Sequence, residues 1–286
     1  MKRKIKIVTD SCSSLTRQEC EEMDIVCLET NFMVDGNLHN AFDDESVSLK
    51  DFYEELDKSK SCSTGCVNEQ TFSECFEGLI EKDCSVIYIG LSSFLSSTYS
   101  HSEAVANNLN EKYNEKVVSV VDSRCGSYGM LLLIEKAQEM IKQDMSLQEI
   151  EDALNETVKN MAVSFVPRDL SFMYKCGRIS AVEAGVGKLL HIVPIVSVSE
   201  SGKLKVSEKC LGFKNAMKTL KNKYANAIKN KGITRCYITS CNLDQDTEAL
   251  KQFILENTDI KEVKTGLIDK TLACCCGPKT IAIFCG

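Results

Sequence analysis

Hydrophobic and polar positions along the chain alternate between short apolar runs and longer segments with helical spacing. The short runs are rich in β-branched residues and predict strands. These strands cover residues 4–8, 25–28, 32–34, 86–89, 116–121, 163–166, 194–198, 204–206, 234–239, 263–267 and 280–284. Several segments between them carry apolar residues three or four positions apart, which predicts helices. A helix-capping pattern, Ser or Thr followed three residues later by an acid, occurs at Thr16, Ser48, Thr71 and Ser146.

The order of these elements predicts an α/β protein with two lobes. In the first 159 residues strands and helices alternate with short turns, which is typical of a parallel, doubly wound sheet. From residue 160 onward we expect a hairpin turn at residues 199–202 and a lysine-rich helix that ends near Gly232. We therefore predict a doubly wound domain over residues 1–159 and an α+β domain over residues 160–286. A cleft between two lobes is a common place for a ligand.

A hydroxyl-rich turn follows the predicted strand of residues 86–89. It contains Ser92, Ser93 and Ser96 and leads into a helix, so that hydroxyls and unpaired backbone N–H groups meet at one point. One hydroxyl would suffice to cap the helix, so the cluster favours a site for a small anion such as a carboxylate or a phosphate. Carboxyl ends of parallel strands meet at one edge of a sheet, where we expect this turn to converge with two other polar strand ends. Those strand ends are Asp10-Ser11 and Asp122-Ser123.

The composition narrows the classes of function. The chain has 286 residues and a net charge of −7, which argues against a nucleic-acid binder. No apolar run approaches the ~20 residues of a membrane span and no secretion signal is recognisable, so we expect a cytoplasmic protein. One stretch departs from the acidic average, because residues 203–231 contain nine lysines and one acid, Glu208. Such a stripe is either a solvated helix face or a surface for an acidic partner or a phosphate.

The sequence lacks the motifs of common enzyme classes. There is no phosphate-binding loop, and Gly185 and Gly187 lack the third glycine and the preceding strand of a dinucleotide motif. His39, His101 and His191 show no spacing of a catalytic or zinc site. The sequence therefore predicts a binding protein rather than an enzyme, with no catalytic residue, no metal and no cofactor.

Sixteen cysteines are distributed along the chain. Thiols of a cytoplasmic protein stay reduced and no Cys-x-x-Cys pair occurs, so we expect neither a disulfide scaffold nor a zinc site. Three consecutive cysteines, residues 274–276, leave open a second hypothesis, a thiol-based protein that binds a soft metal or senses oxidants. We expect these residues on a strand, where neighbouring side chains point to opposite faces and a disulfide between neighbours would be strained.

Several motifs, taken together, resemble the DegV family over essentially the whole chain. They are Thr9-Asp10-Ser11, residues 91–99, residues 121–124, residues 169–180, residues 187–195 and Gly277-Pro278. The resemblance implies a two-lobed fold with a long-chain fatty acid in a tunnel between the lobes. It also implies that the protein presents this fatty acid to a separate fatty acid kinase, which phosphorylates the carboxylate. We expect the protein itself to be a monomer.

The resemblance also implies roles for individual residues. Thr64 is expected to hydrogen-bond the carboxylate of the fatty acid. Ser96 is the first candidate for the second donor, followed by Ser93 and Ser92 of the same turn. Arg178 is expected beside the anion at the lobe interface. The strand-end residues are expected to support the site, and they are Asp10, Ser11, Asp122 and Ser123.

Four positions depart from the family pattern. Cys275 stands where the family has a histidine that is expected to contact the carboxylate, and a thiol is a weaker hydrogen-bond donor. Lys279 replaces a glycine and is a candidate to supply a positive charge near the ligand. Leu211 replaces an arginine in the segment that is expected to meet the kinase, and Val193 replaces a lysine. The chain is therefore identified as a divergent member, for which another small amphiphilic anion is an alternative ligand.

Overall fold

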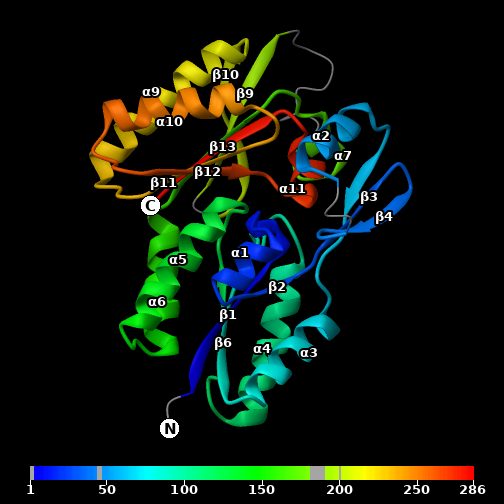
Figure 1. The fold of residues 1–286 in the computed structure, drawn as a ribbon, viewed down its shortest axis with the longest axis vertical. Helices are drawn as coiled ribbons and strands as arrows, with labels where there is room; N and C mark the ends of the chain where they lie inside the picture. Colours follow the sequence, from blue (N-terminus) through cyan, green and yellow to red (C-terminus); the bar gives the residue numbers. More distant parts are fainter. Residues whose placement is uncertain (1–2, 44–46, 181–190, 200) are drawn as a thin grey trace.

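The computed structural model describes residues 3–43, 47–180, 191–199 and 201–286. Two lobes follow one another along the longest axis, with the N-terminus at the far end of the first lobe and the C-terminus near the middle (Figure 1). Within the described ranges, no helix is long and apolar enough to cross a membrane. Gly185, Gly187 and the first residues of the 187–195 motif lie outside the described residues, as does residue 200 of the predicted hairpin turn.

The sheet of the first lobe is entirely parallel, as the alternation of strands and helices predicts. Its strand order is β2-β1-β6-β7, formed by Val26–Leu28, Lys4–Asp10, Cys84–Gly90 and Val118–Asp122. The central strand β6 is paired on both sides and buried on both faces, so its apolar side chains require helices above and below the sheet.

Helices cover both faces of this sheet, so the lobe is doubly wound. They are η1 (Ser11–Ser13), α1 (Arg17–Glu22), α3 (Glu69–Ile80), α4 (Thr98–Tyr113), α5 (Tyr128–Lys142) and α6 (Leu147–Asn160). On one face, α3 and α4 bury Phe72 and Leu109 next to Tyr88 of β6. On the other face, α5 and α6 pack around Ile87 and Ile89. Figure 1 shows the two helix pairs on opposite sides of the sheet.

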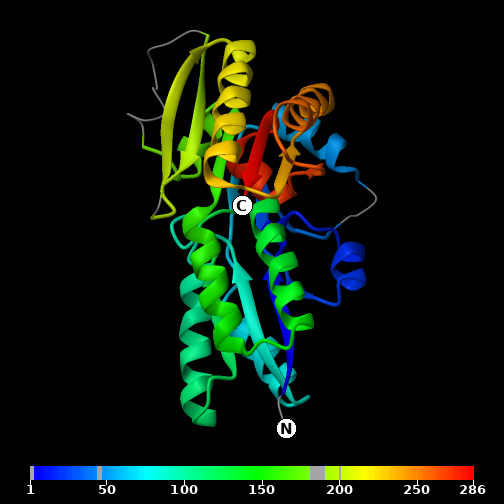
Figure 2. The same ribbon diagram turned by 90° about the vertical axis from the view of Figure 1, so that its left-hand side faces the viewer.

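The second lobe is built on a mixed sheet with the strand order β10-β9-β8-β13-β11-β12. Its strands are β8 (Ala162–Pro167), β9 (Ile192–Val198), β10 (Leu204–Leu211), β11 (Cys236–Ser240), β12 (Val263–Leu267) and β13 (Thr280–Cys285). Helices α9 (Phe213–Lys231) and α10 (Asp244–Asn257) cover one face. The β9–β10 hairpin lies beside α9 (Figure 2). The opposite face presents Tyr237 and Phe284 to α5 of the first lobe.

A segment from the first half of the chain packs against the second lobe. It forms a small antiparallel sheet, β4-β3-β5, and one helix. Its elements are β3 (Asn31–Val34), β4 (Asn37–Asn40), α2 (Leu49–Lys58) and β5 (Cys62–Thr64). They contact two short helices of the second lobe, α7 (Ser171–Lys175) and α11 (Lys270–Cys276). The division into residues 1–159 and 160–286 stays a prediction, and it falls before the last residue of α6, Asn160.

Two local predictions are wrong. Helix α3 begins at Glu69 rather than after Thr71, because the Asn68 side chain accepts a hydrogen bond from the Thr71 N–H at 2.9 Å. Residues 274–276 end helix α11 rather than lying on a strand, because Asp269 caps the start of that helix and Gly277 terminates it. The short elements β4, β5 and α7 were not predicted, since none is long enough to show a periodic pattern.

Replacing Asn68 with alanine is expected to lower the free energy of unfolding by about 1 kcal/mol, because an N–H group of the first turn of α3 loses its acceptor. Thr71→Ala is the matched control, since Thr71 lies inside the helix and alanine has the higher helix propensity. Urea denaturation of both variants measures the difference. A larger loss for Thr71→Ala than for Asn68→Ala would contradict the assigned start of α3.

Candidate ligand-binding site

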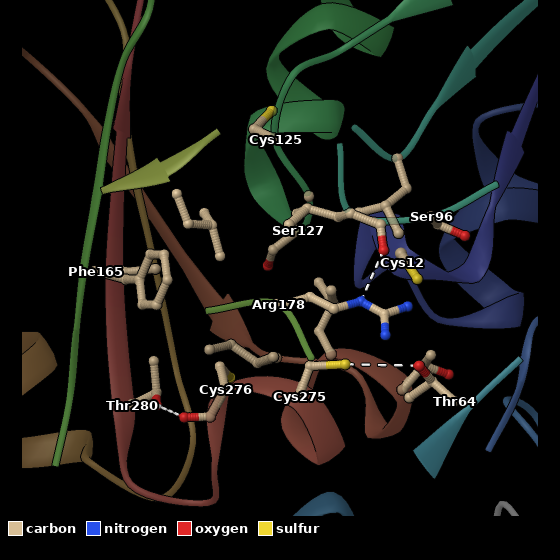
Figure 3. Close-up of a pocket in the computed structure, with 18 of the residues that line it drawn as sticks. Cys12, Thr64, Ser96, Cys125, Ser127, Phe165, Arg178, Cys275, Cys276 and Thr280 are labelled. Carbon is tan, nitrogen blue, oxygen red and sulfur yellow. Dashed lines mark hydrogen bonds between the residues drawn. The ribbon is translucent and has the colours of Figure 1, made fainter. Parts of the chain in front are cut away.

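A cavity lies between the two lobes, at the carboxyl end of the parallel sheet. It holds about 900 Å³ of space free of protein atoms, counting the solvent at its open mouth. The loops after β1, β6 and β7 contribute to its wall from the first lobe, together with the end of β5. The wall of the second lobe comes from β8, β9, β10, β13, α7 and α11. In Figure 3, Thr64, Ser96 and Cys12 lie on one side of this cavity and Phe165 lies on the other.

Most of the lining is apolar and comes from both lobes. The apolar side chains are Leu91, Leu95, Val163, Phe165, Met173, Val198, Leu204, Ile268, Leu272, Ala282 and Phe284. A lining of this kind favours a hydrocarbon ligand, because apolar groups that leave water stabilise a complex roughly in proportion to their area.

Four residues that were singled out from the sequence line this cavity, and they are Thr64, Ser96, Arg178 and Cys275. The hydroxyl of Thr64, at the end of β5, lies 3.6 Å from the sulfur of Cys275 in the last turn of α11. The Ser96 hydroxyl accepts a hydrogen bond from the Thr98 N–H at 3.2 Å, which places Ser96 at the start of α4. Three separate elements therefore bring hydroxyl and thiol groups to the cavity wall.

Arg178 supplies a positive charge at this wall. Its Nε donates to the Leu95 carbonyl at 2.9 Å, and its Nη1 donates to the Cys176 carbonyl. Within the part of the chain that the structure describes, no acidic side chain forms an ion pair with Arg178. A guanidinium that is held by carbonyl groups, without an acidic partner in the described ranges, favours an anionic ligand.

The pKa of the Cys275 thiol is lowered in this environment. Hydrogen bonds from Cys176 and Thr64 stabilise the thiolate, and the charge of Arg178 adds to them, while burial acts in the opposite direction. A thiolate and a bound carboxylate would repel each other. Binding of a carboxylate therefore favours the protonated, neutral form of Cys275.

The polar clusters at the ends of β1, β6 and β7 converge, as predicted, but they bind one another. The Asp10 carboxylate accepts hydrogen bonds from the Tyr88 hydroxyl at 2.6 Å and from the Leu91 N–H at 3.0 Å. Burial raises the pKa of Asp10, and these bonds counteract that rise. The Asp122 carboxylate accepts from the Ser93 N–H at 3.1 Å and from the Ser93 hydroxyl at 2.6 Å. These contacts hold the loop after β6 in position.

The other serines of these clusters lie outside the cavity lining and also bind protein groups. Ser92 is fully buried. The Ser11 hydroxyl lies 2.7 Å from the Thr30 hydroxyl, and the Ser123 hydroxyl donates to the Cys125 carbonyl at 3.0 Å. Thr30 and Cys125 do line the cavity, so Ser11 and Ser123 contact the lining rather than the cavity itself.

Lys279 does not lie at the cavity. Its Nζ forms an ion pair with Asp57 at 2.6 Å, between two exposed side chains. The expected replacement charge is therefore on the surface, and Arg178 is the charged side chain that lines the cavity. As to metals, the described ranges hold no group of three or more His, Cys, Asp or Glu side chains that could bind one.

Sequence reasoning missed a hydroxyl network behind the cavity wall. Ser127 lines the cavity, and its hydroxyl lies 2.8 Å from that of Ser14. The Ser14 hydroxyl also lies 2.8 Å from the carboxylate of Asp269, the residue that caps α11. Ser14 and Asp269 are 255 residues apart in sequence, so no local pattern could have indicated their contact.

Comparison with known proteins identifies the family. A family model described as "Uncharacterised protein, DegV family" matches residues 4–285. The chain belongs to the DegV family. A DegV domain-containing protein of Clostridium perfringens is 29% identical over 282 residues, which are 99% of this chain and 97% of that protein. The resemblance inferred from the motifs is thus confirmed.

Solved DegV structures share the fold of this chain. A DegV family protein from Thermus thermophilus, described for its fatty acid binding, has a TM-score of 0.87 and 21% identity, with 99% of both chains covered. A crystal structure of a DegV family protein from Ruminococcus gnavus, described with vaccenic acid, has a TM-score of 0.86 and 21% identity, also with 99% of both chains covered. The two-lobed α/β fold is therefore that of DegV proteins.

Asp269 is expected to make stability depend on pH. Burial raises its pKa from 3.8 to about 7, against hydrogen bonds from the Leu272 N–H and the Ser14 hydroxyl that lower it. Because the folded state then binds a proton that the unfolded state has lost, the contribution of Asp269 to stability falls as the pH rises from about 4 to 7.

The variant Asp269→Asn keeps a capping residue and cannot ionise. Its stability relative to the unmodified protein is expected to increase from pH 4 to pH 7, by at most about 1.4 kcal/mol per pH unit. Thermal or urea unfolding at a series of pH values measures this difference. A difference that is constant across this interval would contradict the raised pKa.

Proposed function

We propose that this DegV protein is a carrier that binds one long-chain fatty acid in the cavity between its lobes. The observation that supports the proposal best is the lining, which combines a long apolar wall with a cation, Arg178, that forms no ion pair with an acidic side chain of the described residues. An amphiphile with a hydrocarbon chain and one negative charge matches both features. The DegV structures from Thermus thermophilus and Ruminococcus gnavus, described with fatty acids, support the same class of ligand.

The hydrocarbon chain would supply most of the affinity. Each CH₂ group that is buried contributes about 0.8 kcal/mol, so a long chain compensates the cost of binding even without strong polar contacts. Phe165 of β8 lies across the cavity from Thr64 and Ser96 (Figure 3). We infer that the chain extends toward Phe165.

The carboxylate would bind beside Thr64, Ser96 and Arg178. A buried carboxylate needs hydrogen-bond donors, and donors that carry a charge give the stronger bonds. Arg178 provides the charge, and the two hydroxyls provide neutral donors from separate elements. The Cys275 thiol, in its protonated form, is a weaker fourth donor.

We further propose that the protein presents the carboxylate to a separate fatty acid kinase, as the resemblance implies. Gly65 follows Thr64, lines the cavity and is exposed, which supports a mouth at the carboxylate end. A second protein could reach the carboxylate there. Leu211, where the family pattern has an arginine, is also exposed, so any contact of this residue with the kinase would be apolar.

Mass spectrometry of ligand extracted from the purified protein tests this proposal. We expect a stoichiometric long-chain fatty acid from the unmodified protein and a strongly reduced amount from Thr64→Val and Ser96→Ala. Losing one hydrogen bond to a charged group weakens binding by about 10- to 100-fold. Ser100→Ala is the matched control, because Ser100 is exposed on α4, lies outside the cavity lining, and its hydroxyl donates to the nearby Ser97 carbonyl. A different amphiphilic anion in the extract, or an empty protein, would contradict fatty acid binding.

Arg178 and Lys279 are expected to behave differently in a binding titration with a fluorescent fatty acid. Arg178→Gln should raise the dissociation constant by about 10- to 100-fold, because the carboxylate loses its charge-assisted donor. Lys279→Gln removes a cation that pairs with Asp57 on the surface, and the constant should stay the same. Equal effects of the two substitutions would indicate a general electrostatic attraction instead of a contact with Arg178.

A further inference from the structure

Cysteines from three elements meet outside the cavity lining, beside residues of the proposed carboxylate site. Cys62 lies on β5, Cys176 is the C-cap of α7, and Cys274 lies in α11. The Cys62 thiol donates to the Cys274 carbonyl oxygen at 3.2 Å, and the Cys176 thiol donates to the same oxygen at 3.4 Å. Two thiols that are far apart in sequence thus converge on one backbone atom.

The two thiols differ in acidity and in access to solvent. Hydrogen bonds from Cys176 and Cys274 lower the pKa of Cys62, and the charge of Lys175 adds to this effect. Hydrogen bonds with Cys275 and Cys62, together with burial, raise the pKa of Cys176. Cys62 is half-buried, whereas Cys176 is buried. An accessible thiol of low pKa beside a second thiol is the arrangement of redox-sensing cysteines.

This thiol pair lies next to the residues of the carboxylate site. Cys62 precedes Thr64 by two positions, so both side chains lie on the same face of β5. Cys176 precedes Arg178 by two positions and receives a hydrogen bond on its carbonyl from the Arg178 guanidinium. A covalent bond between Cys62 and Cys176 would therefore join the strand that carries Thr64 to the segment that carries Arg178.

We propose that a hydroperoxide converts Cys62 and Cys176 into a disulfide that closes the carboxylate end of the cavity. The Cys62 thiolate attacks a peroxide oxygen, an S–O bond forms, the O–O bond breaks, and the leaving oxygen takes up a proton. The Cys176 thiol then loses its proton and attacks the Cys62 sulfur, an S–S bond forms, and the S–O bond breaks with release of water. The two thiols lose two electrons in total, and the peroxide gains them.

In another cysteine pair, Cys20 with Cys27, the thiol with the lowered pKa is not the one that is accessible to solvent. Its thiol with the lowered pKa is Cys20, which has 4% exposure, whereas the half-buried Cys27 has a raised pKa. The pair Cys236 with Cys285 has no exposure at either residue. A peroxide is therefore expected to react at Cys62 before it reacts at these pairs.

Peptide mapping of the full chain tests the disulfide directly. The reduced protein is treated with hydrogen peroxide, blocked with N-ethylmaleimide and digested with trypsin, which releases Cys176 in a peptide of residues 176–178. We expect to find this peptide joined by a disulfide to the peptide of residues 61–82. Dithiothreitol should break the link, and the variant Cys62→Ser should not form it. Because the longer peptide also contains Cys66 and Cys75, Cys66→Ser and Cys75→Ser are the matched controls, and both should retain the link. Absence of the link from the unmodified protein would overturn the assignment, and so would its loss in either control variant with retention in Cys62→Ser.

The closure rests on the proposed function and has its own measurement, the transfer of bound oleate to phospholipid vesicles. Peroxide treatment should slow this transfer by about tenfold, since changes in binding act mostly on dissociation rates. Dithiothreitol should restore the rate, and Cys176→Ser should not respond to peroxide. An unchanged rate in the oxidised protein would overturn the closure. If the disulfide forms but the protein does not bind oleate, the proposed ligand is overturned. If the protein binds oleate but no disulfide forms, the disulfide alone is overturned.

Discussion

The carboxylate of Asp269 connects the parts of the chain that enclose the cavity. It accepts a hydrogen bond from the Leu272 N–H at 2.9 Å, which starts helix α11, and it lies 2.8 Å from the Ser14 hydroxyl in the loop after β1. Helix α11 in turn contacts β3, β5, α2 and α7, and it carries Cys275. One capped helix therefore positions the small sheet, α7 and part of the cavity wall relative to one another. Without hydrogen-bond partners, a carboxylate in this place would be costly.

The polar groups of the first lobe divide into two sets with different tasks. Asp10 and Asp122, at the ends of neighbouring strands, bind Tyr88, Leu91 and Ser93 and thereby fix the loop after β6. The hydrogen-bonding groups of these residues are paired within the protein and are therefore not available to bind a ligand. The polar side chains that line the cavity come from separate elements, among them Thr64, Ser96 and Arg178. The groups that bind one another within the first lobe thus hold the loop that carries part of this lining.

The cysteines follow a similar division. Many are buried in strands and helices, where a thiol packs as a small apolar group. Around the Cys274 carbonyl, in contrast, the thiols of Cys62 and Cys176 lie in a polar environment next to Arg178. In the proposed carboxylate site, Arg178 would supply the charge, and the thiol of Cys275 lies beside Thr64 at the cavity wall.

Local sequence patterns determined the parallel sheet, most helices and the family, because strand and helix periodicity and contiguous motifs depend on neighbouring residues. They also indicated Thr64, Ser96, Arg178 and Cys275 through the family resemblance, but not that Asp10 and Asp122 bind protein groups instead of a ligand. The small sheet, the helical state of residues 274–276 and the contact of Ser14 with Asp269 were decided by tertiary structure. The physical reason is the same in each case, since short elements and buried hydrogen bonds are stabilised by partners far away in the sequence.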